Sequence, residues 1–279
     1  MGLFKYMGVV AATSFLENLT IRYNQVKAYN DPFEMSPVFI TDQPNKKGQG
    51  LEVKYAGFTS GLESLSYDHI PNGYDRIRPP FIDNINQKMG ICCFTQSSEV
   101  FPSNLVMWAH YADSHKGIVI QLKDKFLSSD MLNKVRYVDQ RPIFDVVDFT
   151  KNNEIFVSDF FFKSTDWKYE NEYRHIQSLE GYCVTAKDDD GKPKKVDDYN
   201  VYLSTFSPEA IDRIILGTGV SNEIVDLAKQ FNKNYGTPII CLRTSRHDFT
   251  LLPKELISSD KLEMQRFANE CSPIDWGEH

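Results

Sequence analysis

The sequence predicts one α+β domain over residues 1–279, with mixed or antiparallel central sheets flanked by helices. Short β-branched and aromatic runs recur along the whole chain, whereas clear amphipathic helices are few. No repeat, low-complexity segment or linker divides the chain. With 41% hydrophobic and 25% charged residues, the composition is that of a globular protein with a sizeable core. We treat residues 253–279 as a C-terminal extension.

Strands dominate the first half of the predicted fold. Apolar and β-branched runs predict strands at residues 3–7, 20–26, 89–98, 117–122 and 134–138. A helix is expected over residues 11–19, with Thr13 or Ser14 as its N-cap, and a second helix over residues 104–117.

Turn and loop signals separate these elements. Asp31-Pro32 predicts a turn, because proline cannot continue a helix. Polar loops are expected at 43–50 and 71–80, with loops and short helices between them. Residues 186–198, which are rich in charge, predict a solvated hairpin tip.

The stretch WKYENEYR, residues 167–174, alternates aromatic and charged side chains. This period of two predicts a strand with Glu170 and Glu172 on one face, about 7 Å apart. The preceding residues 144–162 carry aromatic and aliphatic side chains at roughly helical spacing.

The C-terminal part alternates strands and helices. Ser207-Pro208-Glu209 predicts a helix start. A helix is clearest from Ser221 as N-cap to Gly236 as its end. Strands are expected at residues 212–219, 238–243 and 249–253.

Charge and cysteine content limit the function classes. The net charge is −7 and the pI is near 5.4, so a global attraction to nucleic acid is not expected, although basic residues gather at 21–27 and 75–80. The five cysteines are odd in number and form no C-x-x-C pair, which favours a reducing cytoplasm. The chain begins without a signal-peptide pattern, and no run of 18 apolar residues predicts a membrane span.

Common catalytic motifs are absent, including the P-loop, H-E-x-x-H and G-x-S-x-G. The glycine-containing segment 216–223 fits either a phosphate site at a helix N-terminus or a plain strand-to-helix turn. A metal site would draw on His110, His115, Glu170 and His175. Because zinc ligands usually come in closer pairs, we predict no metal site.

Five segments place a polar group beside an aromatic one where an element is expected to end. A carboxylate at a strand end can stabilise an oxocarbenium-like ribose, and aromatic rings can stack a flat base beside it. The segments are residues 5–6, 30–34, 92–95, 108–117 and 167–174.

Each of these residues also has a purely structural explanation. Phe33 and Trp108 would serve as core anchors, and His110 would be a core histidine with its hydrogen bonds satisfied. Glu170 and Glu172 would pair with Arg174 or Lys168 on an exposed face.

In this order, the five segments resemble a poorly characterised bacterial family of unknown function. Its pattern of a K-Y strand, N-D-P-F-[DE], C-F-[ST], W-x-H-Y-x-x-x-H-x-G and W-x-Y-E-x-E-x-R is present as LFKY, NDPFE, CFT, WAHYADSHKG and WKYENEYR. The resemblance spans residues 3–252. The layout of that family is in turn similar to ADP-ribosyltransferases, which implies a split central sheet.

The resemblance implies a role for nine residues of this chain. In an ADP-ribosyltransferase-like reaction a late-strand glutamate offsets positive charge on the ribose of NAD. The implied catalytic residues are Glu170, Glu172 and His110, and the implied NAD contacts are Lys5, Tyr6, Thr95, Trp108, Tyr111 and Arg174. The place of Glu170 in the family pattern favours it over Glu172. Thr95 departs from many relatives, which have serine there.

The sequence therefore predicts a cytoplasmic NAD-dependent ADP-ribosyltransferase-like enzyme, a toxin or defence effector that modifies nucleic acid or protein. The macromolecular acceptor and the oligomeric state stay open. One alternative is a non-catalytic nucleotide-sensing or interaction module of a defence system. A second is a metal-dependent hydrolase or nuclease.

Overall fold

A computed structural model describes residues 2–40, 52–55, 58–61, 85–99, 101–124, 126–127, 130–145, 154–258 and 265. The chain forms two compact units. Unit 1 comprises residues 1–21, 94–126 and 205–279, and unit 2 comprises residues 22–93 and 127–204. Strand β6 contributes its last residues to unit 1 and its first residues to unit 2, because the boundary falls after Cys93.

Unit 1 is built on a mixed sheet in the strand order β20-β19-β18-β7-β1-β6. β18 and β19 are parallel, whereas β1 with β6, β1 with β7, β7 with β18 and β19 with β20 are antiparallel. The strands are β1 (Gly2–Met7), β6 (Met89–Ser97), β7 (Ile118–Leu122), β18 (Ile211–Leu216), β19 (Ile239–Thr244) and β20 (Leu251–Ile257). The helices are α1 (Val9–Asn18), α3 (Leu105–Tyr111), η4 (Pro208–Ala210) and α5 (Asn222–Tyr235).

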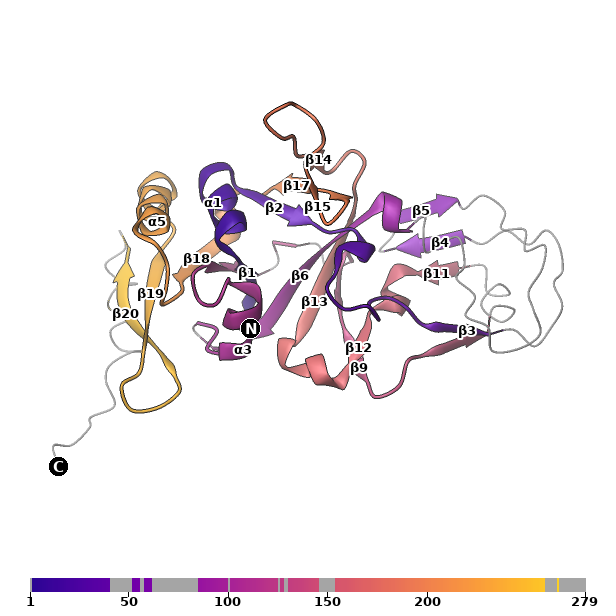
Figure 1. Cartoon of the computed structure of the whole chain (residues 1–279), viewed down its shortest axis with the longest axis horizontal. Coiled ribbons are helices and arrows are strands. Elements are labelled where there is room, and N and C mark those ends of the chain that lie inside the picture. The colour runs from indigo at the N-terminus through magenta and orange to yellow at the C-terminus, as the bar shows by residue number, and fades with distance from the viewer. Residues whose placement is uncertain are drawn as a thin grey trace. The chain divides into compact units, whose positions relative to one another are not determined.

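The core of unit 1 lies where helices cover this sheet. Ile118, Val119 and Ile120 of β7 are all fully buried, as expected for a strand with both faces covered. Helices α1 and α5 lie side by side, with the rings of Phe15 and Phe231 stacked 5.7 Å apart (Figure 1). Apolar burial thus fixes the helix layer against the sheet.

Unit 2 consists mainly of short strands. β13 has β6 and β8 as its neighbours, and three further pairs, β3 with β10, β4 with β11 and β9 with β12, are parallel. The strands are β2 (Thr20–Tyr23), β3 (Val38–Ile40), β4 (Glu52–Tyr55), β5 (Phe58–Gly61), β8 (Leu132–Lys134), β9 (Arg136–Val138), β10 (Ile143–Asp145), β11 (Glu154–Phe156), β12 (Phe162–Ser164), β13 (Glu172–Ser178), β14 (Val184–Thr185), β15 (Lys195–Val196), β16 (Tyr199–Asn200) and β17 (Tyr202–Thr205). The first two residues of β2 and the last residue of β17 belong to unit 1. Its 3₁₀ helices are η1 (Val26–Ala28), η2 (Val157–Phe160) and η3 (Thr165–Glu170).

The α+β class with a mixed sheet is confirmed. The strands predicted from residue 3, residue 89 and residue 117, and the helix between Ser221 and Gly236, all lie where expected. The single domain over 1–279 stays a prediction beside the two units. β20 continues to Ile257, so the expected C-terminal extension starts inside a strand. The predicted loops at 43–50 and 71–80 lie outside the described residues.

The cap predicted for the first helix is wrong. α1 begins after Gly8, which places Thr13 and Ser14 inside the helix. The Thr13 hydroxyl donates to the carbonyl of Val9 (3.0 Å). Asp113 caps the helix from another element, because its Oδ2 accepts from Val9 N at 2.6 Å.

The helix predicted over residues 104–117 is shorter than expected. α3 ends at Tyr111, and Asp113, Ser114 and His115 all adopt positive φ angles of 46°, 54° and 70°. Three successive left-handed residues break the helix, although its apolar spacing continues.

Two other segments contain strands among their described residues. Of residues 144–162, the structure describes 144–145 and 154–162, which hold the end of β10, then β11, η2 and the start of β12 in place of one helix. Of the segment between the two polar loops, the structure describes β4 and β5, which form an antiparallel pair where loops and short helices were expected. β10 and β4 also pair with β3 and β11, which are distant in sequence, and such pairing overrides local spacing.

We call residues 113–115, with their positive φ angles, the left-handed corner. The chain requires a glycine just after this corner, where it passes close to β1. A Cβ on Gly117 would lie 2.0 Å from the carbonyl oxygen of Met7, whereas a Cβ on Gly219 would have no neighbour closer than 3.5 Å. We expect Gly117→Ala to lower the free energy of unfolding by about 2 kcal/mol or more, because backbone must shift. Gly219→Ala is the matched control and should change it by less than about 1 kcal/mol. Equal effects of the two variants in thermal or urea unfolding would contradict this.

Candidate functional site

Five charged side chains from three segments meet in unit 2, and we call them the charge network: Glu34, Lys163, Glu170, Glu172 and Arg174. Lys163 Nζ lies 2.6 Å from a Glu170 oxygen, 3.0 Å from Glu172 and 3.8 Å from Glu34. Each of the five residues is less than 9% exposed. Buried charges of this kind persist only when they are paired.

Arg174 is the most enclosed member of the network, with 0% exposure. Its Nε and Nη2 donate to the two oxygens of Glu172 at 2.8 and 3.1 Å, a bidentate pair. Nη2 also lies 2.6 Å from Glu34 Oε1, a charge contact outside hydrogen-bond angles. The guanidinium lies over the rings of Tyr29 and Phe161, at 5.7 and 5.1 Å from their centroids.

The local fold of WKYENEYR differs from the predicted strand. Residues up to Glu170 form η3, Asn171 turns the chain with φ of 42°, and β13 starts at Glu172. The two glutamates therefore do not share one strand face by alternation. They converge because both reach Lys163, whereas Glu172 and Arg174 do share a face of β13.

The expected exposed face is also wrong. Glu170 is 3% and Glu172 is 4% exposed, while Lys168 lies on the surface and is not their partner in the ion pairs described. The lysine that pairs with them is Lys163, directly after a run of buried phenylalanines. In the sequence, Lys163 could have been found as a single cation at the end of an aromatic run. Glu34 could have been found as the acidic residue of the NDPFE segment.

The charges set opposite pKa shifts within the network. Burial raises the pKa of Glu172, but Arg174 and then Lys163 outweigh it and hold the pKa well below its usual range. Burial raises the pKa of Glu34 above its usual value despite Arg174 and Lys163. The network thus favours the charged form of Glu172, whereas burial favours the neutral form of Glu34.

Of the residues predicted for the site in unit 1, Tyr6 packs against Trp108. Its ring lies edge-on to Tyr6 (5.5 Å) and stacks with His115 (6.0 Å). Trp108 is fully buried and its Nε1 donates to the carbonyl of Pro102 at 2.7 Å, so it is a core anchor. The Tyr6 hydroxyl is buried without a hydrogen-bond partner in the described part of the chain, and burial with the charge of Glu99 raises its pKa.

The other residues predicted for the site in unit 1 have different surroundings. Lys5 lies over the ring of Phe94 at 6.0 Å. Thr95 on β6 is half-buried opposite Phe4. His110 is exposed on α3, with its ring centroid 6.0 Å from that of Tyr111, so the core histidine expected there is wrong. The core position expected for Phe33 in unit 2 is also wrong, because Phe33 is 57% exposed.

Lys5, Tyr6, Thr95, Trp108, His110 and Tyr111 belong to unit 1, and Glu170, Glu172 and Arg174 belong to unit 2. Within unit 1 the structure joins Tyr6 with Trp108, and within unit 2 it joins the two glutamates with Arg174.

The glycine-containing segment after β18 is a structural turn. The amides of Gly217 and Gly219 donate to the carbonyls of Gly117 (3.1 Å) and His115 (2.9 Å). Ser221 Oγ accepts from Ile224 N at the start of α5. These groups are occupied within the fold, which favours the plain turn over the phosphate site.

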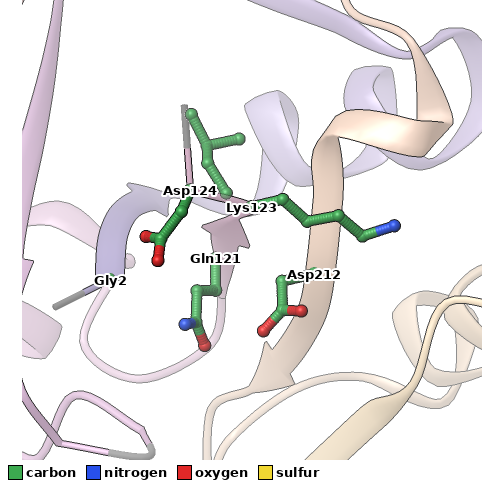
Figure 2. A pocket seen from close by; sticks show the side chains of 6 residues that line it. Gly2, Gln121, Lys123, Asp124 and Asp212 are labelled. Carbon is green, nitrogen blue, oxygen red and sulfur yellow. The ribbon is translucent and has the colours of Figure 1, made fainter. Parts of the chain in front are cut away.

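A polar pocket lies at the ends of β1, β7 and β18 (Figure 2). The side chains of Gln121, Asp124 and Asp212 surround it, and Lys123 extends to one side. Its lining includes Gly2 but none of the residues predicted for the site. Two carboxylates and an amide suit a small polar group rather than a flat aromatic base.

No group of three or more His, Cys, Asp and Glu side chains is placed to hold a metal ion among the described residues. Of the histidines considered, His175 is buried, and its Nδ1 lies 2.9 Å from the hydroxyl of Tyr23. No helix in the described ranges is long and apolar enough to cross a membrane.

Comparison with known proteins identifies part of the chain. A family model described as a protein of unknown function (DUF2971) matches residues 107–175. This confirms the resemblance to a family of unknown function over the part that holds WAHYADSHKG and WKYENEYR. No curated protein and no solved structure matches the chain, and no likeness to ADP-ribosyltransferases is found.

The network predicts a large cost for removing one partner. We expect Arg174→Met to lower the free energy of unfolding by about 3–5 kcal/mol, because Glu34 and Glu172 lose their buried counter-ion. Arg213 pairs with Asp212 at 3.1 Å on a partly exposed surface, so Arg213→Met should cost about 1 kcal/mol or less. Urea unfolding measures both, and similar costs would contradict the buried network.

The burial of His175 predicts that the free energy of unfolding depends on pH. Burial lowers its pKa to about 4, below the unfolded value of about 6.5, so folding favours the neutral ring. Above pH about 6.5 the neutral ring adds up to about 3 kcal/mol to the free energy of unfolding. This contribution is lost as the pH falls towards 4. His175→Gln should remove this part of the pH dependence of unfolding. An unchanged slope between these pH values would refute the assignment.

Proposed function

We propose that the chain is an ADP-ribosyltransferase-like enzyme of the cytoplasm that uses NAD as its substrate. One observation supports this most: three carboxylates of the charge network share only two cations in a buried place, so the network carries one excess negative charge whenever Glu34 is ionised. Cleavage of the nicotinamide–ribose bond develops positive charge on the ribose. An anionic, water-poor place favours that charge more than bulk water does.

Within the network we assign the ribose contact to Glu170. Glu172 is held by two nitrogens of Arg174 and by Lys163, so it is a positioning residue that keeps both cations in place. Glu170 is the last residue of η3, and Asn171 in the left-handed region follows it. A small rotation at this junction would withdraw Glu170 from Lys163 and turn it towards substrate.

Burial supports a second candidate function. At 3% and 4% exposure, neither glutamate meets solvent, and catalysis requires the network to open. A module that binds a nucleotide without turning it over requires no such opening. The same measurements separate the two candidates.

The test uses the full chain with NAD labelled in the nicotinamide ring. Nicotinamide release needs no identified acceptor, since water can take the ribose. We expect Glu170→Gln to reduce release by about 100-fold or more, because Gln keeps the shape and removes the charge. Glu180, which is exposed just beyond β13, supplies the matched control, and Glu180→Gln should retain full activity.

Thermal unfolding with and without NAD completes the test. Release by the wild type that is lost in a folded Glu170→Gln variant supports the transferase. Stabilisation by NAD without release supports the binding module. Full release by both Glu170→Gln and Glu172→Gln, or no response to NAD at all, overturns the proposed enzyme. NAD labelled in its adenylate part is then incubated with the enzyme and DNA, RNA or protein. The macromolecule that acquires the label identifies the class of acceptor.

A further inference from the structure

We propose that the loop of the β19–β20 hairpin in unit 1 is a binding surface for single-stranded nucleic acid. Phe249 in this loop has 95% of its surface open to solvent. Arg243, Arg246 and His247 are exposed in the same hairpin. The surface belongs to unit 1 and is independent of the function assigned to the charge network.

The loop is held in one shape by its own hydrogen bonds. Ser245 N donates to the carbonyl of Thr250 (2.9 Å), and Ser245 Oγ accepts from the amides of His247 and Asp248 at 3.1 and 3.3 Å. The Thr250 hydroxyl donates to Asp248 Oδ1 at 2.5 Å. A loop that is already ordered loses little conformational entropy on binding, so its exposed ring is ready for a partner.

The loop joins the yellow strands β19 and β20 in Figure 1, and β20 is the last strand of the unit 1 sheet. Leu251, the first residue of β20, is 3% exposed and belongs to the core. Phe249 precedes β20 in the loop, and its own exposure shows that its ring lies in solvent outside that core.

These surroundings favour a nucleic acid over a protein partner. A protein interface centres on an aromatic anchor ringed by other apolar contacts, whereas Phe249 has polar and charged neighbours, Arg246, His247, Asp248 and Thr250. An isolated ring can stack a base of any sequence, and guanidinium groups beside it can contact phosphates. The overall charge of −7 opposes nucleic acid at long range, and the hairpin offers only two exposed arginines for phosphate contacts, so we expect modest affinity with a shallow dependence on salt.

The experiment measures fluorescence anisotropy of a labelled oligothymidylate of about 15 nucleotides, a length that fits one such binding surface. An abasic oligonucleotide of equal length carries the same phosphates without bases. We expect the full chain to bind oligothymidylate more tightly than the abasic strand. Phe249→Ala should weaken binding to oligothymidylate about fivefold or more and leave abasic binding unchanged, because only stacking is lost.

Arginine and control variants separate charge from stacking. Arg246→Ala should weaken binding to both strands and reduce the slope of log affinity against log salt by about 0.7, the value for one phosphate contact on a single strand. Tyr182→Ala and Lys192→Ala, at exposed positions of unit 2, should change neither affinity.

Three results would overturn the proposal: no binding of oligothymidylate at low salt, equal binding of the two oligonucleotides by the wild type, or unchanged affinity of Phe249→Ala. Displacement of oligothymidylate by polyglutamate at equal charge concentration would also overturn it, since it would show a surface selective for acidic chains rather than for bases. All these substitutions are at exposed positions, so thermal unfolding should match the wild type.

Discussion

The burial of Arg174 beneath aromatic rings constrains the rest of unit 2. A guanidinium with no exposed surface requires counter-ions within reach, and Glu34 and Glu172 supply them. Three carboxylates together then exceed the charge of Arg174, and Lys163 from β12 offsets part of that excess. The turn before β3, the strand β12 and the strand β13 are thus held together by electrostatics as well as by packing.

The same arrangement connects stability with chemistry. Charges that cannot be removed singly without a large cost keep their geometry, and a fixed electric field is what transition-state stabilisation requires. The network is nevertheless closed, with Glu170 and Glu172 shielded from water. In the enzyme proposed above, catalysis would therefore depend on the junction at Asn171, where a 3₁₀ helix changes to a strand. A folded, inactive Glu170→Gln variant would identify a catalytic residue that a purely structural ion pair does not explain.

Unit 1 depends on close backbone contacts rather than on buried charge. The left-handed corner after α3 brings Asp113 to the start of α1 and brings the His115 carbonyl to the Gly219 amide. Trp108 packs between Tyr6 and His115 and is hydrogen-bonded in the core. The conspicuous WAHYADSHKG segment is therefore explained in large part by the folding of unit 1, and the exposed chemistry of this unit lies elsewhere, on the β19–β20 hairpin.

By itself, the sequence determined the α+β class, the positions of β1, β6 and β7, and the capped helix α5, because these depend on local periodicity and cap residues. It also singled out WKYENEYR as unusual. Tertiary structure decided that this stretch is a 3₁₀ helix followed by a strand, and that Glu170 and Glu172 are buried against Lys163. Alternation of residue types predicts a face but not a partner. The partner, Lys163, lies in a different segment. Only the folded chain brings its positive charge close enough to stabilise the buried glutamates.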